Sequence, residues 1–355
     1  MGADWGEWRR QRLQSLRLAL AIFGFAVLPV LLEVTLLAHA SRDGIFAIDF
    51  HQTFLPAANK LAAGHSPYPA YGYPPLVAFL LVPLTFVPSP ALVFTIVLAL
   101  SVPAALWLIG VRDWRCYGTA FLWAPVYHGL QTANVSILLL LAAALCWRYR
   151  DMARSVAVSG GLGIAAKVIS WPLLVWCAAT RRISATLGAV TVAVVVTLGL
   201  WASIGFSGLL DFPKNTNTLQ KQVSPGSYTL KALAVDAGLP ASVGTALSAA
   251  LVLVVLALCV VYGRRGDDRR SFSFAVLACI VASPIVWLHS FVFLLVPVAL
   301  YRPRFSPVWL LPVLLVAGSG TGNGAPWQTL LVLGVSGFVF VRSVYFGSAP
   351  EPEPA

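Results

Sequence analysis

Residues 18–40 read LALAIFGFAVLPVLLEVTLLAHA, an apolar run interrupted by one carboxylate, Glu33. A helix rises about 1.5 Å per residue, so this run is long enough to cross the hydrocarbon core of a bilayer. Four arginines precede it and it ends in Ala-His-Ala, a pattern shared with cleavable signal peptides. A signal peptide has an apolar core of only about 7–15 residues. We therefore predict an uncleaved first transmembrane helix.

The whole chain has the composition of a membrane protein. Of its 355 residues, 59% are hydrophobic and 10% are charged, whereas soluble domains carry about 25% charged residues. A soluble protein of this length could not cover its surface with so few charges. The formal net charge is +11, which we attribute to arginines that orient membrane helices rather than to nucleic-acid binding.

The cysteines and histidines give no metal or redox motif. All five cysteines lie in or beside apolar runs without CxxC spacing, and the five histidines are scattered. We interpret the cysteines as small core residues. Neither an HExxH motif nor an acidic loop for Mg²⁺ or Ca²⁺ is present. We therefore expect no metal and no cofactor.

Basic clusters separate the apolar runs and orient them. An even number of crossings should separate successive clusters, because positively charged loops stay in the cytoplasm. The clusters are 9–17, 112–115, 148–154, 181–182, 264–270, 302–304 and Arg342. The predicted spans are 18–40, 90–111, 116–128, 134–147, 155–167, 168–180, 184–205, 241–263, 271–288, 290–301, 308–318 and 328–341. The short run 75–88 is predicted to be re-entrant or interfacial.

The resulting topology sorts the cations cleanly. Eighteen arginines fall on the cytoplasmic side, while Arg42 and all five lysines fall outside. We predict an all-α polytopic membrane protein, a bundle of about 11–13 transmembrane helices of which several are short. Its parts would be a basic cytoplasmic N-terminus (1–17), a transmembrane domain (18–342) with long outer loops at 41–89 and 206–240, and a disordered cytoplasmic tail (343–355).

Asp49 is the most conspicuous of the four carboxylates that this topology places outside, the others being Asp43, Asp211 and Asp236. It begins an amphipathic segment. At 100° per residue, Asp49 and Lys60 share one side of a helix and Phe50 and Phe54 lie on the other. Such a helix would lie in the membrane interface and present Asp49 and Lys60 together. Asp49 is then a candidate base, although a simple helix-capping role is the alternative.

Other polar residues gather on the same predicted side. The stretch 64–75 is rich in Gly, Pro and Tyr, which suits the headgroup layer or stacking on a sugar or lipid. GLQTAN (129–134), Lys167 and SPIVWLH (283–289) each lie where a short helical pair turns. Lys167 could snorkel to the interface. Short pairs that all end in polar groups would instead form a cavity for an anionic lipid ligand, which loop 206–240 could cover.

These landmarks, in order from residue 49 to 289, resemble glycosyltransferase family 87 of the GT-C superfamily. The pattern is D-F, A-x-x-L-x-x-G-x-x-P-Y, Y-P-P, then GLQTAN, a lone Lys before W-P-L-L, and S-P-I-x-W-x-H. The family includes actinobacterial polyprenol-phosphate-mannose-dependent mannosyltransferases and related arabinofuranosyltransferases. The family's G-Q-x-N reads G-L-Q-T-A-N here.

The resemblance implies a GT-C bundle in the plasma membrane with an extracytoplasmic active site. It implies a metal-independent, inverting transferase that moves a sugar, mannose in the first instance, from a polyprenyl-phosphate donor to a lipid-linked glycan or polysaccharide acceptor. Asp49 matches the family's catalytic aspartate. The expected donor-phosphate residues are Lys167, His289 and Lys60, and the expected substrate-binding residues are His51, Tyr68, Tyr73, Gln131, Asn134 and Trp287. An arabinofuranosyltransferase and a lipid-linked sugar transporter or flippase are the alternatives.

Overall fold

The computed structural model describes residues 3–223, 226–318 and 325–347, and throughout these ranges every regular element is helical. The α-helices are α1 Ala3–Ile22, α2 Leu28–Arg42, α3 Leu55–Ala62, α4 Pro75–Leu81, α5 Pro90–Ile109, α6 Trp114–Phe121, α7 Ala124–Gln131, α8 Ser136–Arg148, α9 Ala153–Ala166, α10 Pro172–Ala179, α11 Ile183–Ala202, α12 Phe212–Val223, α13 Leu230–Asp236, α14 Ala241–Arg264, α15 Asp268–Val281, α16 Leu295–Tyr301 and α17 Pro326–Val344. The prediction of an all-α protein is confirmed. Most of the predicted disordered tail, 348–355, lies outside the described residues.

Shorter helical segments join or extend these helices. Phe23–Val27 and Phe50–Phe54 are π-helical turns, and Val82–Phe86, Val168–Ser170, Leu288–Leu294 and Pro307–Gly318 are 3₁₀ segments. Within the described ranges, five helices are long and apolar enough to cross a membrane: Trp8–Arg42, α5, α11, α14 and α17. Five shorter apolar segments accompany them: Pro75–Phe86, Ser136–Arg148, Val168–Ala179, Leu288–Tyr301 and Pro307–Gly318.

The predicted spans agree with these helices with two exceptions. The predicted span 271–288 is helical only as far as Val281, where α15 ends. The predicted span 116–128 is two helices, α6 and α7, which are interrupted at 122–123. Pro125 stands in the first turn of α7, where its missing N–H and fixed φ favour a helix start. The predicted outer loops also contain regular structure, because α3 and α4 lie in 41–89 and α12 and α13 lie in 206–240. The number of crossings stays a prediction.

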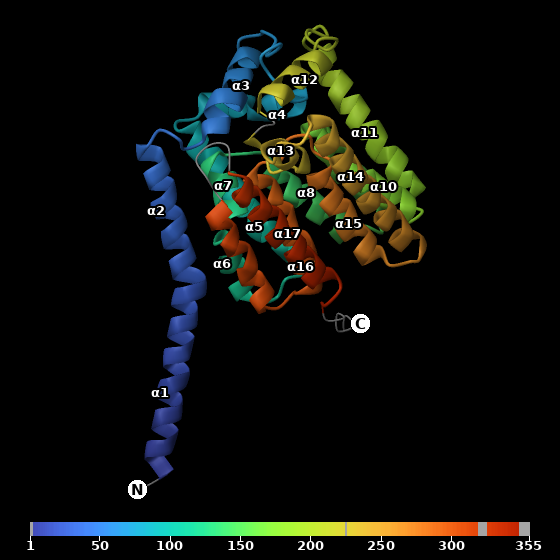
Figure 1. Cartoon of the computed structure of the whole chain (residues 1–355). Helices are drawn as coiled ribbons and strands as arrows, with labels where there is room; N and C mark the ends of the chain where they lie inside the picture. The colour runs from blue at the N-terminus through green and yellow to red at the C-terminus, as the bar shows by residue number, and fades with distance from the viewer. Residues whose placement is uncertain (1–2, 224–225, 319–324, 348–355) are drawn as a thin grey trace.

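The first helix stands apart from the rest of the bundle (Figure 1). Only a small share of Trp8–Arg42 is buried. It contacts the bundle through α2, which packs against α6 and α7, and through the π turn, where the Phe25 ring lies edge-on to Trp114 and Phe305. A Cβ at Gly118 of α6 would collide with the backbone of Phe25. Glycine at this position therefore lets the first helix approach α6 closely.

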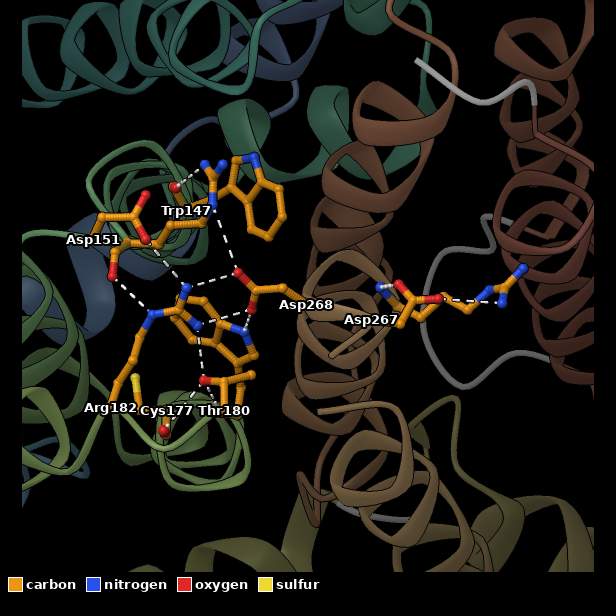
Figure 2. A network of polar contacts seen from close by, with 10 residues as sticks. Trp147, Asp151, Cys177, Thr180, Arg182, Asp267 and Asp268 are labelled. Atoms are coloured by element: carbon orange, nitrogen blue, oxygen red, sulfur yellow. Dashed lines mark hydrogen bonds and ion pairs between the residues drawn. The ribbon is translucent and has the colours of Figure 1, made fainter. Parts of the chain in front are cut away.

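At one end of the bundle, three of the predicted arginine-rich connections meet around Asp268 (Figure 2). The Arg182 guanidinium donates to both carboxylate oxygens of Asp268, at 2.9 and 2.8 Å. Trp176 Nε1 donates to Asp268 at 2.6 Å, and Arg150 forms an ion pair with it at 3.6 Å. These residues come from the α8–α9 turn, the α10–α11 corner and the start of α15. This carboxylate therefore joins the α8–α9 turn and the α10–α11 corner to the start of α15.

A second junction at the connection between α5 and α6 is built in the same way. Asp113 accepts hydrogen bonds from the Arg115 side chain and from the Phe305 N–H. The Arg115 hydrogen bonds lower the Asp113 pKa to about 2, so this carboxyl is ionised at any physiological pH. The predicted clusters 112–115 and 302–304 are thus neighbours, because Arg112 N–H also donates to the Pro303 carbonyl.

The opposite end is covered by α3, α4 and α12, which lie together at the top of the view (Figure 1). The Tyr68 ring stacks on Trp201 with 5.3 Å between centroids, and Phe212 lies edge-on to both. An added Cβ at Gly72 would stand 3.0 Å from Leu219 of α12. The two long segments that the sequence places on one side, 41–89 and 206–240, therefore pack on each other there.

Candidate active site

Asp49 lies in the tight connection between α2 and the π turn Phe50–Phe54. The N–H groups of Ala47 and Asp49 donate to the carbonyls of Gln131 and Thr132, at 2.6 and 3.1 Å. Ala47 adopts a left-handed conformation with φ 54°. These bonds hold the segment against the C-terminal end of α7.

The side chain of Asp49 makes no capping hydrogen bond to the helix that follows it. Its Oδ2 instead accepts a hydrogen bond of 2.6 Å from Asn134 Nδ2, across 85 residues of sequence. The capping alternative is therefore wrong, since a capping aspartate accepts from the backbone N–H groups of its own helix. The Asp49 carboxylate belongs to a tertiary polar group.

That polar group continues from Asn134 to Lys167. The Asn134 Oδ1 accepts from the Ser136 N–H at 2.9 Å, which directs the amide NH₂ towards Asp49. The Lys167 ammonium donates to Ser136 Oγ at 3.3 Å and stands 5.6 Å from the centre of the Tyr73 ring. Lys167 occurs where α9 ends and the 3₁₀ segment Val168–Ser170 begins. The Asp49 carboxylate and the Lys167 ammonium are thus held by one chain of hydrogen bonds through Asn134 and Ser136.

The protonation of Asp49 reflects two opposed effects. Burial raises its pKa above the ordinary 3.8, while the Asn134 hydrogen bond and the Lys167 charge act to lower it. Among the described residues, the two charged groups do not approach within the 4.0 Å of an ion pair. Asp49 is therefore a stronger base than an exposed aspartate, and its carboxylate is not neutralised by a direct partner.

His289 completes the group from the C-terminal half of the chain. It lies in the 3₁₀ segment Leu288–Leu294, its side chain is 1% exposed, and the charge of Lys167 acts on it. Its ring stacks on that of His128 from α7. The structure thus brings together five residues selected from the sequence: Asp49, Tyr73, Asn134, Lys167 and His289.

Other predicted site residues stand outside this group. His51 and Lys60 are exposed, and the charge that acts on the Asp49 carboxyl is that of Lys167 rather than Lys60. The π turn explains the difference, because i→i+5 bonding breaks the 100° spacing on which the predicted pairing depended. The apolar side was predicted correctly, since Phe50 and Phe54 are fully buried. A phosphate role for Lys60 stays a prediction.

Tyr68, Gln131 and Trp287 support or border the site. The Tyr68 hydroxyl donates to the Tyr73 carbonyl at 2.9 Å, so Tyr68 positions Tyr73. Gln131 contributes its backbone carbonyl to the Asp49 segment. Trp287 is half-buried and precedes the 3₁₀ segment that carries His289. Their substrate contacts stay predictions.

Three site residues were not identified from the sequence: His128, Thr132 and Ser136. The Thr132 side chain interacts with the Asp49 carboxyl, and Ser136 links Asn134 to Lys167. His128 and Thr132 are four residues apart, the spacing that places two side chains on one helix face. This spacing is the one feature of the sequence that could have indicated that His128 lies on the same face as Thr132. In the described part of the chain, no three His, Cys, Asp or Glu side chains form a possible metal site, and metal independence stays a prediction.

A helical membrane bundle with a carboxylate, an ammonium and the imidazole of His289 close together is the arrangement that the sequence led us to expect of a membrane transferase. The family model for glycosyltransferase family 87 matches residues 71–290, well over half of the chain. The chain therefore belongs to glycosyltransferase family 87 and is a membrane glycosyltransferase. No curated protein and no solved structure matches it. The matched region includes Asn134, Lys167 and His289 but begins after Asp49.

Proposed function

We propose that this glycosyltransferase moves mannose from a polyprenyl-phosphate donor to a lipid-linked glycan acceptor at the extracytoplasmic face of the plasma membrane. The observation that carries the proposal is the placement of a half-buried carboxylate, Asp49, near a half-buried ammonium, Lys167, with Asn134 and Ser136 linking the two through hydrogen bonds. A glycosyl phosphodiester needs both charges, a base for the incoming hydroxyl and a cation for the departing phosphate.

The proposed reaction is a single displacement with inversion. The acceptor oxygen forms a bond to the anomeric carbon while the bond from that carbon to the phosphate oxygen breaks. The Asp49 carboxylate takes the proton of the acceptor hydroxyl, for which its raised pKa suits it. The Asn134 amide holds the carboxylate in position. The products are the glycosylated acceptor and polyprenyl phosphate.

Lys167 and His289 would bind the phosphate of the donor. The phosphate gains negative charge as its bond to the sugar breaks, and a fixed cation in a buried site stabilises that charge strongly. Lys167 is held by Ser136 and by the face of Tyr73, so little reorganisation is needed. The phosphate is already part of a lipid, which agrees with the absence of a nucleotide-binding loop from the sequence.

The sidedness of the proposal depends on the two ends of the bundle. Arg150 and Arg182 meet at one end, which the positive-inside rule assigns to the cytoplasm. The Asp49 site would then face outward. A membrane-impermeant maleimide on intact cells should label K214C, from exposed α12, and not R265C; all native cysteines are buried. The reverse pattern would contradict this orientation.

The decisive assay uses the purified full-length protein in lipid with a mannolipid acceptor. Polyprenyl-phosphate mannose should support transfer with one polyprenyl phosphate released per product, and GDP-mannose should not. Transfer from polyprenyl-phosphate arabinose alone would make the protein an arabinofuranosyltransferase. Movement of intact donor across the vesicle membrane without release of polyprenyl phosphate would instead indicate a flippase.

A further inference from the structure

His128 on α7 stands against the candidate site without a role in the mechanism above. We propose that His128 is a second phosphate-binding imidazole, which together with His289 and Lys167 surrounds the lipid phosphate of the donor and of the product. This inference rests on the proposed function and assigns a binding residue to it. His128 does not touch the reacting carbon.

The first observation is the geometry of the two imidazoles. The rings of His128 and His289 lie nearly parallel, with an interplanar angle of 26° and 5.6 Å between centroids. They come from α7 and from the 3₁₀ segment Leu288–Leu294, which are packed against each other. An added Cβ on Gly129 would stand 3.5 Å from the His289 Cβ. That separation is an ordinary van der Waals distance, so the two segments pack in direct contact beside the stacked rings.

The second observation is that the imidazole nitrogens lack partners in the part of the chain that the structure describes. Both ring nitrogens of His289 and the Nδ1 of His128 are buried without a hydrogen bond. Buried polar atoms are normally paired, because leaving one unpaired is costly. Three unpaired nitrogens on two stacked rings, with the charge of Lys167 acting on His289, indicate a site for a polar ligand.

The chemistry of the nitrogens selects the ligand. A neutral imidazole offers one N–H donor and one acceptor. Phosphate oxygens accept from N–H donors, and the nearby Lys167 ammonium supplies the charge that an anion requires. The sugar is attached to the same phosphate, and one of its free hydroxyls can donate to the remaining ring nitrogen of His289. A glycosyl phosphate therefore satisfies this group better than an uncharged lipid does.

The position of His128 also couples the phosphate to the base. His128 and Thr132 lie one turn apart on α7, and the Thr132 hydroxyl and N–H both bond to the His128 carbonyl. The Thr132 carbonyl in turn accepts from the Asp49 N–H, and its side chain acts on the Asp49 carboxyl. One helical turn thus fixes the distance between the phosphate and the catalytic carboxylate.

The test measures binding of farnesyl phosphate, a short polyprenyl monophosphate, to the full-length protein in detergent. H128F should weaken this binding about tenfold or more, because hydrogen bonds to a charged group are lost. The KM for the donor should rise in parallel while the KM for the acceptor is unchanged. H128Q, which keeps an N–H donor, should recover part of the affinity.

Controls separate the phosphate from other effects. Y127F changes the preceding residue of α7 and should bind farnesyl phosphate as the native protein does. Farnesol tests the lipid chain alone and should bind equally to the native protein and to H128F. Inorganic phosphate tests the free anion, and competition by it at similar concentration would point to a phosphate site that does not require the lipid.

Two failures are distinguishable. If H128F and H128Q bind farnesyl phosphate as tightly as Y127F while the native enzyme transfers mannose normally, the role of His128 is wrong and the proposed function stands. If the native protein binds farnesyl phosphate through His128 but does not transfer sugar from a polyprenyl-phosphate donor, the proposed reaction is wrong. Should H128F fail to fold, the comparison of H128Q with Y127F decides the question.

Discussion

The two ends of the bundle each hold an aspartate near a cation, but only one of these aspartates is fully paired. Asp268 accepts from both Arg182 nitrogens and from Trp176, with Arg150 beside it. Asp49 accepts from Asn134, and its cation, Lys167, donates to Ser136 instead. Both cations face an aromatic ring, Trp176 for Arg182 and Tyr73 for Lys167.

The difference shows how the same residue types can stabilise the fold at one end of the bundle and form a candidate site at the other. A carboxylate whose acceptor positions are filled has no capacity left for a ligand, so the Asp268 group holds helices together. A carboxylate and an ammonium that share a frame without neutralising each other keep their charges available to a substrate. Asp113, the carboxylate at the α5–α6 connection, shows the same contrast with Asp49: the Arg115 hydrogen bonds lower the Asp113 pKa to about 2, whereas burial raises the pKa of Asp49.

The largest predicted effect is the loss of transfer in D49N. Removing a general base should lower kcat by about 10²–10⁴-fold. The thermal unfolding midpoint should be unchanged, because asparagine retains the shape of the residue. D43N is the matched control, since Asp43 is an exposed carboxylate in the same connection. Equal activity of D49N and D43N would end the assignment of Asp49 as the base.

The reciprocal change at the other end should affect stability rather than activity. D268A leaves Arg182 and Trp176 without their acceptor and should cost about 2 kcal/mol of unfolding free energy. D267A removes the cap of α15 and should cost about 1 kcal/mol. Thermal unfolding of each variant in detergent measures both losses of stability. A D268A protein with native stability and impaired donor binding would break the distinction between the two ends.

K167M should weaken use of the donor. Loss of the cation should raise the donor KM about tenfold, with little effect on the acceptor KM. K214M removes an exposed lysine from α12 and provides the control for total charge. If K167M raised the acceptor KM and left the donor KM unchanged, Lys167 would belong to the acceptor side of the site.

N134A should have the smallest effect on activity. It tests specifically whether Asn134 positions the Asp49 carboxylate. The Asn134 hydrogen bond lowers the Asp49 pKa, so its loss should raise that pKa further. The acid limb of the rate profile should move to higher pH, and kcat at pH 7 should fall by several-fold at most (~1 kcal/mol for one hydrogen bond). A profile identical to that of the native enzyme would show that Asn134 does not orient the base.

The sequence predicted the helices well where hydrophobicity decides them. The span predicted at 241–263 is α14 at Ala241–Arg264, because a long apolar run bounded by arginines has few alternatives in a membrane. Prediction failed where backbone geometry departs from the regular helix. The predicted pairing of Asp49 with Lys60 assumed 100° per residue, whereas Phe50–Phe54 forms a π turn. The spacing of residue types in the sequence does not indicate i→i+5 bonding.

The residues of the site were largely predictable, but their connections were not. Asp49, Lys167 and His289 could be selected because polar residues in an apolar chain are conspicuous. That Asn134 donates to Asp49 depends on tertiary contacts between segments 85 residues apart. Ser136 and His128 escaped selection because a serine at a helix start and a histidine on a short helix are common in proteins of every kind.

The most direct test of the central claim is the pH dependence of kcat/KM for transfer, measured for the native enzyme, K167M and the residual activity of D49N. A base must be ionised, so the native rate should fall as pH decreases through the Asp49 pKa, which burial sets above 3.8. Because the Lys167 charge lowers that pKa, the limb should lie at higher pH in K167M, and it should vanish in D49N. An unchanged acid limb in D49N would contradict the account.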